Sequence, residues 1–471
     1  MSIPRTPPDA LARRRQALLD RLDTPALLSA GSLVSRNYPA ATYPFRAASH
    51  FLYLVGQSVP GAALLLRDGQ ATLYAPPPDP EDELWLGPRP SLDELGAAAG
   101  LAPAQPIEEL PTALEAIDQP VATLATQDTK SAAQLSRWLG RAIEPGSAVR
   151  IPDGTIDAAL SDAIIALRLV HDEAGLAQIR AAADATVRGF RAAMAATRTA
   201  STEAEVHAAM LQSLLADQMG LSFGPIVSVR GEILHNEDHS GAIAPGDLLL
   251  ADVGGETPEG WAADITRVWP VSGRFSPSQR DVYQVVLGAQ LAAIDRAKPG
   301  VRYREVHEAA KRATVEGLRD LGVFRGEVDG LLERGAAAIF FPHGIGHLMG
   351  LDVHDMEDLG DRAGYAPGRA RSERFGDAYL RLDRDLEPGM VVTIEPGFYQ
   401  VPAILRDEAY TGAVGGDLDR EALGRLADVR GIRIEDDILI TPEGNEVLTA
   451  GAPKEPAAVE AAVSGTAART S

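Results

Sequence analysis

The sequence contains no cysteine among its 471 residues. Disulfides, thiolate metal sites and cysteine nucleophiles are therefore excluded, and any metal ion must be held by His, Asp or Glu. Basic residues are also scarce, because 44 Lys and Arg stand against 66 Asp and Glu and leave a net charge of -22. Such a surface repels nucleic acid and anionic membranes, so we expect neither as a partner.

Long apolar runs are missing as well. No uninterrupted apolar stretch approaches the length of about 20 residues that a membrane-spanning helix needs. The opening stretch, MSIPRTPPDALARRRQ, has basic residues but no apolar segment typical of a signal peptide. We therefore expect a cytoplasmic location.

The length favours two or three domains. Residues 24–150 alternate short apolar runs with turns, where AALLLRDGQATLYAPP predicts a hairpin and FLYLVG predicts a buried strand. The Pro/Gly-rich stretch 143–155 has no clear period and predicts a linker. We expect an N-terminal α/β domain over residues 1–150, a second domain over residues 156–452 and a flexible, Ala-rich tail over residues 453–471.

The second domain mixes long helical patterns with strands. Thr202 with Glu205, and Ser276 with Gln279, predict two capped helix starts. The strand-like runs are GPIVSV, DLLLADVG, WAADITRVWP, GMVVTIEPG and GIRIEDDILIT. Because several strands follow one another directly, we expect an antiparallel-rich α+β domain and not a doubly wound one. Residues 357–385 and 401–428 are charged and poorly patterned, which predicts surface insertions beside the functional site.

Each of these later strands carries an acid among apolar residues. A hairpin turning at residues 257–259 would set Asp252 directly opposite Asp264. Strand alternation puts Glu395 on the same face as Thr393, and Glu435 on the same face as Arg433. Together with His347, these acids predict a site for two divalent cations. Four clustered carboxylates would otherwise repel one another and lose hydration, whereas two cations remove that cost and can ionise water at neutral pH.

Taken one at a time, these features have ordinary structural interpretations. An Asp at a strand end is commonly a turn residue, IEPG can be a strand ending in a turn, IRIEDDILI can be an edge strand with a solvated acidic face, and HGIGH can be a glycine loop. The ordered combination favours the metal site and a hydrolase.

The combination resembles the pita-bread metallopeptidases, specifically the branch of Xaa-Pro aminopeptidases and Xaa-Pro dipeptidases (prolidases). The motifs that carry the resemblance are DVGG…ADITRVWP, FPHGIGHLMGLDVHD, VVTIEPGFY and GIRIEDDILIT, with FRAASHFLYLVG and PEDELWLGPRPS in the N-terminal half. The resemblance implies a C-terminal pita-bread catalytic domain and a smaller N-terminal creatinase-like α/β domain that contributes to oligomerisation and walls off the active site.

The resemblance also implies roles for individual residues. Asp264 and Glu435 would bridge both ions, Asp252 would bind one, and His347 and Glu395 would bind the other. Glu395 would also relay a proton from the activated water to the leaving proline nitrogen. His235, His343 and His354 would line the substrate site, and Tyr399 and Arg433 would orient the substrate or the ligands. The ligand set suits Mn²⁺, with Zn²⁺ or Co²⁺ as alternatives.

The implied activity is release of the first residue from short peptides with proline at the second position. The alternatives are a dipeptidase confined to dipeptides and a non-catalytic binding module of the same fold, while a methionine aminopeptidase is disfavoured by the additional N-terminal domain. We expect a homodimer or a homotetramer. Where relatives carry acids that meet the substrate amine from a neighbouring subunit, this chain has Ala48 and His50, so the recognition of the amine is left open.

Overall fold

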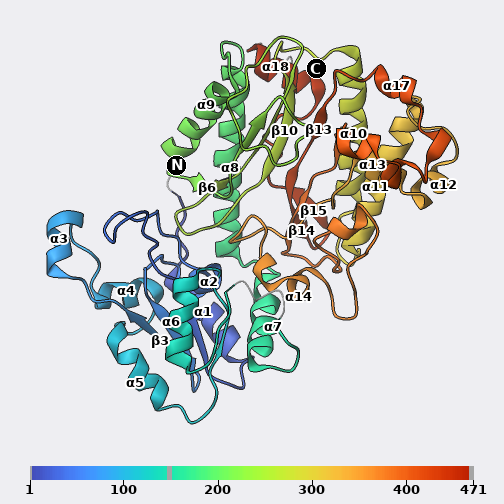
Figure 1. Ribbon diagram of the computed structural model, residues 1–471. Helices are drawn as coiled ribbons and strands as arrows, with labels where there is room; N and C mark the ends of the chain where they lie inside the picture. The colour runs from blue at the N-terminus through green and yellow to red at the C-terminus, as the bar shows by residue number, and fades with distance from the viewer. Residues whose placement is uncertain (1–2, 146–150, 466–471) are drawn as a thin grey trace. The chain divides into compact units, whose positions relative to one another are not determined.

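The computed structural model describes residues 3–145 and 151–465, which form two compact units (Figure 1). The N-terminal unit comprises Pro4–Gln178 together with Met356–Ala363, and the C-terminal unit comprises essentially Ile179–Asp355 and the chain from Gly364 onward. The division thus falls within helix α8 (Glu173–Ala196). Within residues 3–145 and 151–465, no helix combines the length and the apolar character that a bilayer crossing requires.

The division between the units differs from the predicted boundary at residues 150–156. Helix α7 (Ile156–Arg168) belongs to the N-terminal unit, where it contacts α1 and β5 and buries Leu160, Ile164 and Ile165. The Pro/Gly-rich stretch before α7 therefore connects two elements of one unit. Residues 146–150 of that stretch lie outside the described residues.

The N-terminal unit is built on one mixed sheet of order β4-β3-β2-β1-β5. Its central hairpin is the predicted one, and Asp68 and Gly69 both have positive φ, as a type I′ turn requires. The strands are β1 (Ala26–Ser29), β2 (Ala63–Arg67), β3 (Gln70–Ala75), β4 (Gln105–Pro106) and β5 (Ala122–Thr123). The helices besides α7 are α1 (Pro8–Leu19), α2 (Ser49–Val55), α3 (Pro80–Leu86), α4 (Leu92–Ala99), α5 (Leu110–Glu115) and α6 (Thr129–Leu139), with the 3-10 turns η1 (Ile107–Glu109) and η3 (Glu357–Leu359).

The prediction of a buried strand at FLYLVG is wrong, because these residues form most of helix α2. Residues 50–55 are all buried, and Gly56 ends the helix with a φ of 71°. A helix that is apolar on every side shows neither the helical nor the strand period, so a short run of this kind is ambiguous from sequence.

The C-terminal unit confirms the antiparallel-rich α+β prediction, since every strand pair in its described residues is antiparallel. Figure 1 shows β10 and β13 between α8 and α9 on one side and α10 and α11 on the other. The strands are β6 (Gly220–Leu221), β7 (Ile226–Ser228), β8 (Leu248–Val253), β9 (Gly255–Glu256), β10 (Ile265–Pro270), β11 (Val391–Ile394), β12 (Gly397–Tyr399), β13 (Gly431–Arg433), β14 (Asp436–Thr441) and β15 (Gly444–Val447). The longer helices are α9 (Glu203–Ala216), α10 (Pro277–Arg296), α11 (Tyr303–Asp320) and α18 (Pro456–Ser464).

Shorter helices lie within residues 328–340 and within the two charged stretches, residues 357–385 and 401–428. They are α12 (Val328–Glu333), α13 (Ala336–Phe340), α14 (Asp361–Gly364), η4 (Asp377–Tyr379), α15 (Pro402–Arg406), α16 (Glu408–Thr411), η5 (Gly415–Asp417) and α17 (Arg420–Gly424).

Both predicted helix starts are present. Ser276 and Gln279 form a reciprocal capping box at α10. At α9 the Thr202 side chain accepts from the Glu205 N–H, but the Glu205 carboxylate accepts from the Ser201 N–H, so this capping is not reciprocal.

The expectation of a flexible tail is wrong for residues 456–464. They form α18, whose Val459 and Val463 lie one helical turn apart and are 0% and 1% exposed in the core. Two valines at this spacing form an apolar stripe, which alanine-rich surroundings concealed in the sequence. Residues 466–471 lie outside the described residues.

Candidate metal centre and active site

Two of the predicted ligands come from the β8–β10 hairpin, but the predicted pairing between them is wrong. Asp252 lies directly opposite Thr266, and Asp264 precedes Thr266 by two residues, so the two aspartates are diagonal neighbours on one face. The turn is centred later than predicted, because the N–H of Thr257 donates to the carbonyl of Trp261 at 2.8 Å. Gly254 makes this hairpin possible, since a Cβ there would come within 1.8 Å of the Ala263 carbonyl oxygen.

The other three predicted ligands come from three further segments. Glu395 follows β11, and Glu435 lies between β13 and β14, where its N–H donates to the Thr266 carbonyl at 3.0 Å. The segment that carries His347 runs antiparallel to β11, because the Thr393 N–H donates to His347 and the Glu395 N–H donates to Ile345. HGIGH is therefore hydrogen-bonded along β11 and its extension and is not a free glycine loop.

One glycine of HGIGH is required by this pairing. A Cβ on Gly346 would come within 2.2 Å of the Thr393 carbonyl oxygen and 2.4 Å of the Tyr303 hydroxyl. Glycine thus lets the backbone of the histidine segment approach β11 closely enough to aim His347 at the acids.

All five predicted ligands line one cavity of about 580 Å³. Ligand atoms of Asp264, His347 and Glu435 lie within 4.8 Å of one another. The Nε2 atom of His347 is 3.6 Å from Asp264 Oδ2 and 3.8 Å from Glu395 Oε1. Since Nδ1 of the same ring lies 3.0 Å from the Leu348 carbonyl, it carries the proton, and the lone pair of Nε2 faces the acids.

The carboxylates are poorly compensated by protein groups. Oδ1 of Asp252 and Oδ1 of Asp264 are buried and accept no hydrogen bond. Burial, followed by the neighbouring carboxylates, raises the pKa of Asp264 and of Glu435 well above the ordinary value, and burial raises the pKa of Glu395 to about 7. Unpartnered oxygens in an acid cluster beside an imidazole lone pair are the donor set that divalent cations satisfy.

The three other predicted histidines also line this cavity. The ring of His354 packs edge-on against that of His347, with centroids 4.2 Å apart. Burial lowers the pKa of His235, and burial together with Arg433 lowers that of His343 to about 3, so both rings are neutral at physiological pH. His343 already uses both nitrogens within the protein, since Nδ1 donates to the Gly344 carbonyl and Nε2 lies 2.9 Å from the Tyr399 hydroxyl.

Comparison with known proteins agrees with this arrangement. Residues 177–442 match metallopeptidase family M24, and residues 11–124 match the N-terminal domain of aminopeptidase P. The chain belongs to metallopeptidase family M24. Xaa-Pro aminopeptidase 2 of Streptomyces coelicolor is 34% identical over 96% of this chain and 90% of that protein. A probable Xaa-Pro aminopeptidase pepP of Talaromyces marneffei is 33% identical over 90% of this chain and 88% of that protein.

Solved structures of this family share the whole architecture. Aminopeptidase PepP of Pseudomonas aeruginosa has a TM-score of 0.80 and 31% identity, and the match covers 99% of both chains. Escherichia coli aminopeptidase P, solved with the inhibitor Pro-Leu, has a TM-score of 0.79 and 29% identity over 98% of this chain and 99% of that chain. The expected fold, a pita-bread catalytic domain preceded by a smaller α/β domain, is confirmed, and the M24 membership identifies divalent metal ions as the cofactor.

Arg433 and Tyr399 lie beside the cluster of predicted metal ligands. The Arg433 guanidinium donates to Asp252 Oδ2 at 2.5 Å, to the Tyr399 hydroxyl at 2.9 Å and to Thr266 Oγ1 at 3.0 Å. Tyr399 is fully buried and does not line the cavity, so it connects Arg433 to His343 from behind.

Sequence reasoning missed two residues that touch the acids. The Thr266 hydroxyl donates to Glu435 Oε2 at 2.7 Å, and Asp437 Oδ2 accepts from the Asp264 N–H at 3.1 Å. Strand alternation puts Thr266 on the face of Asp264 and Asp437 on the face of Glu435, which is the signal that could have found both.

The charged insertions contribute to the cavity as expected. Phe375, Tyr379 and Arg381 from the first, and Ile404 from the second, line it. Residues 357–363 of the first insertion belong to the N-terminal unit.

Proposed function

We propose that this M24 protein is a Xaa-Pro aminopeptidase that releases the first residue of short peptides with proline at the second position. The convergence of Asp252, Asp264, His347, Glu395 and Glu435 in one cavity carries the proposal. Relatives named Xaa-Pro aminopeptidase that align over nine tenths of this chain or more support the substrate class. Proline has no N–H and its ring restricts the chain, so the bond before it needs a dedicated enzyme.

The five residues are proposed as ligands of two divalent cations, with Asp264 and Glu435 shared. When bound, the cations supply Lewis-acid activation of water and of the scissile carbonyl. Mn²⁺ is our first choice, and Zn²⁺ and Co²⁺ are alternatives, because three of the four elements of the site offer only carboxylate oxygen and one offers imidazole. Reconstitution of chelator-stripped protein with each ion, followed by activity measurement, identifies the metal.

The proposed roles of the protein groups follow from their positions. Glu395 is the general base and carries the proton until the proline nitrogen leaves, because a carboxylate that binds a cation still has a lone pair that can accept a proton. His354 and His235 donate hydrogen bonds to the scissile carbonyl and to the substrate backbone. His343, Tyr399 and Arg433 form a connected chain that fixes the orientation of Asp252 and of the cavity wall.

One observation favours the dipeptidase alternative. Arg381 lines the cavity and could hold the carboxylate of a C-terminal proline. The test therefore adds Mn²⁺ to the protein and compares the rates at which it hydrolyses Ala-Pro-Ala, Ala-Pro and Ala-Ala-Ala. Cleavage of Ala-Pro-Ala supports the aminopeptidase, cleavage of Ala-Pro alone makes the protein a dipeptidase, and cleavage of Ala-Ala-Ala at a similar rate overturns proline selectivity.

We also propose that the protein self-associates, as a homodimer or a homotetramer, and acts in the cytoplasm. Self-association is supported by helix α3, where Leu84, Trp85 and Leu86 are 77%, 78% and 63% exposed. Contiguous large apolar side chains of this kind mark interaction surfaces. Light scattering coupled to size exclusion measures the mass directly, and a mass of 49.8 kDa would contradict self-association.

A further inference from the structure

Behind the acid cluster lies a completely buried arginine. Arg267 alternates with Asp264, Thr266 and Val268 along β10, so its side chain leaves the opposite face of the strand, and its side chain is 0% exposed. A buried guanidinium is costly unless all its donors are used. Here all are used, because Nε donates to Pro453, Nη1 donates to Thr266 and Glu435, and Nη2 donates to Asp436 and Ala452.

Two of these acceptors are backbone carbonyls of the segments that carry the proposed ligands. Nη1 donates to the Thr266 carbonyl at 3.0 Å and to the Glu435 carbonyl at 2.5 Å. An isolated bridge between Thr266 and Glu435 also joins the two segments at this point, as does the hydrogen bond from the Thr266 hydroxyl to Glu435 Oε2. One guanidinium thus fastens the crossing at which Asp264 and Glu435 approach one another.

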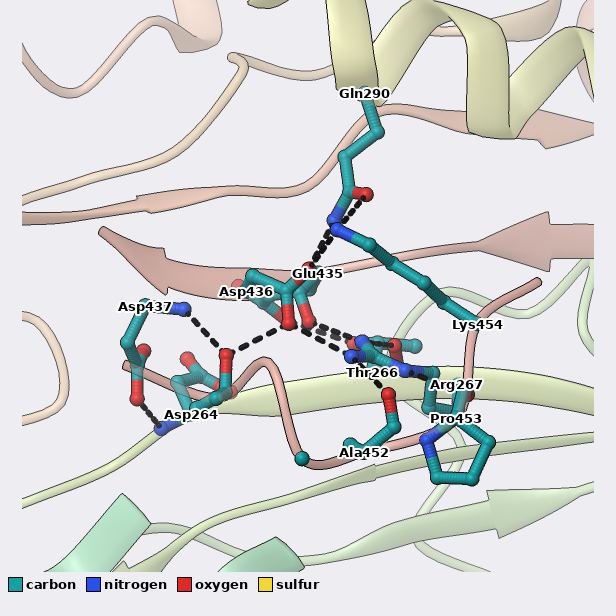
Figure 2. Close-up of polar contacts among 12 residues, drawn as sticks. Asp264, Thr266, Arg267, Gln290, Glu435, Asp436, Asp437, Ala452, Pro453 and Lys454 are labelled. Atoms are coloured by element: carbon teal, nitrogen blue, oxygen red, sulfur yellow. Dashed lines mark hydrogen bonds and ion pairs between the residues drawn. The ribbon is translucent and has the colours of Figure 1, made fainter. Parts of the chain in front are cut away.

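Asp436 holds the guanidinium in place, as Figure 2 shows. Its Oδ1 accepts from Arg267 Nη2 at 2.7 Å and from the Thr449 hydroxyl at 2.7 Å. Its Oδ2 accepts from Gln290 Nε2 at 2.9 Å and from Lys454 Nζ at 2.8 Å. A carboxylate with four donors and no exposure has one available orientation, so it also fixes the plane of the guanidinium.

We propose that Arg267, oriented by Asp436, is a positioning residue of the metal centre that sets the separation of Asp264 and Glu435. The inference rests on the proposed ligand set. Metal ligands must be held to within about 0.5 Å of their productive geometry, and outer groups that orient ligands are typically worth about 10–100-fold in metal affinity. The side chain of Arg267 reaches neither the cavity nor the substrate, so its effect passes through the backbone of the two ligand segments.

The experiment measures Mn²⁺ binding to chelator-stripped protein by titration calorimetry, together with thermal unfolding of the same metal-free samples. In Arg267→Lys the positive charge beside Asp436 is kept, but an ammonium cannot span the five acceptors. We expect Mn²⁺ affinity to fall by about 10–100-fold in this variant. If Arg267→Lys does not fold, Asp436→Asn is used for the test instead. Asparagine keeps the shape of Asp436 and removes its charge, so we expect Mn²⁺ affinity to fall by roughly 3–10-fold.

Lys454→Met is the matched control. Lys454 donates to the Asp436 carboxylate and to the Gln290 side chain, but not to the Thr266 and Glu435 carbonyls that Arg267 binds. We expect it to lower the unfolding temperature and to leave Mn²⁺ affinity within about twofold, because destabilisation alone does not move the ligands. Equal affinity in Arg267→Lys and the unsubstituted protein, or an equal loss in Lys454→Met, overturns the inference. Absence of Mn²⁺ binding by the unsubstituted protein overturns the metal centre itself and the inference with it.

Discussion

Glu395→Gln should increase the stability of the metal-free protein at alkaline pH. The same substitution should abolish the activity of the metal-loaded protein. The Glu395 side chain is 18% exposed, and burial raises its pKa from the ordinary 4.5 to about 7 although Arg433 opposes the change. Without cations, ionisation of this carboxyl opposes folding. Glutamine has nearly the same shape and no ionisation, so it removes the opposition.

The magnitude follows from the two pKa values. Each tenfold change in proton affinity is worth about 1.4 kcal/mol, so the difference between 4.5 and about 7 corresponds to about 3 kcal/mol, which partial hydration reduces to about 2–3 kcal/mol. Below pH 4.5 both the folded and the unfolded chain hold the proton. As the pH rises towards 7 the unfolded chain releases it first, so the metal-free folded protein progressively loses this stability, and above pH 7 the loss is complete.

Urea unfolding of chelator-stripped protein at pH 5 and pH 8 tests the reasoning. Glu395→Gln should match the unsubstituted protein at pH 5 to within about 1 kcal/mol and exceed it by about 2–3 kcal/mol at pH 8. Added Mn²⁺ should reverse the order at pH 8, because only the complete ligand set gains fully from binding. Glu316→Gln is the control, because this side chain is 47% exposed on α11 and lies away from the acid cluster, and its difference from the unsubstituted protein should be the same at both pH values. A variant no more stable than the unsubstituted protein at pH 8 would refute the view that the acids are strained without metal.

Three further changes probe other parts of the molecule. Burial alone would raise the pKa of Asp358, but the neighbouring His50 has the larger effect and holds this pKa at about 2. Asp358→Asn should therefore lower the free energy of unfolding by about 1–2 kcal/mol at pH 7, as measured by urea unfolding. The loss should become progressively smaller as the pH falls below 3.8 towards 2. Val459→Ala should cost about 2 kcal/mol by the same measurement, because it empties a fully buried site under α18. Lys311→Met removes the 2.8 Å ion pair that anchors Asp377. Steady-state kinetics should then show KM raised by roughly 3–10-fold with kcat little changed. An unchanged KM would exclude a role of this ion pair in shaping the cavity wall.

The strands that carry the acids could be predicted from the sequence alone. Alternation along DLLLADVG and GIRIEDDILIT predicted strands, and β8, β13 and β14 are present there. The pairing of Asp252 with Asp264 was wrong because register depends on where a turn closes, and a turn centred one residue later moves every partner by two. The pairing of His347 with β11 could not be predicted, since it joins segments that are 46 residues apart in the chain.

The acids at 435–437 show how much alternation can tell and where it stops. Alternation puts Glu435 and Asp437 on one face and Asp436 on the other, and the structure agrees, since the first two approach Asp264 and the third pairs with Arg267. What alternation cannot supply is the partner. Asp436 is compensated by a buried cation while Glu435 is left with a raised pKa, so adjacent carboxylates of nearly equal chemistry act in opposite ways on stability. That difference is set by Arg267, about 170 residues earlier in the chain, and it becomes visible only when both faces of the crossing strands are known.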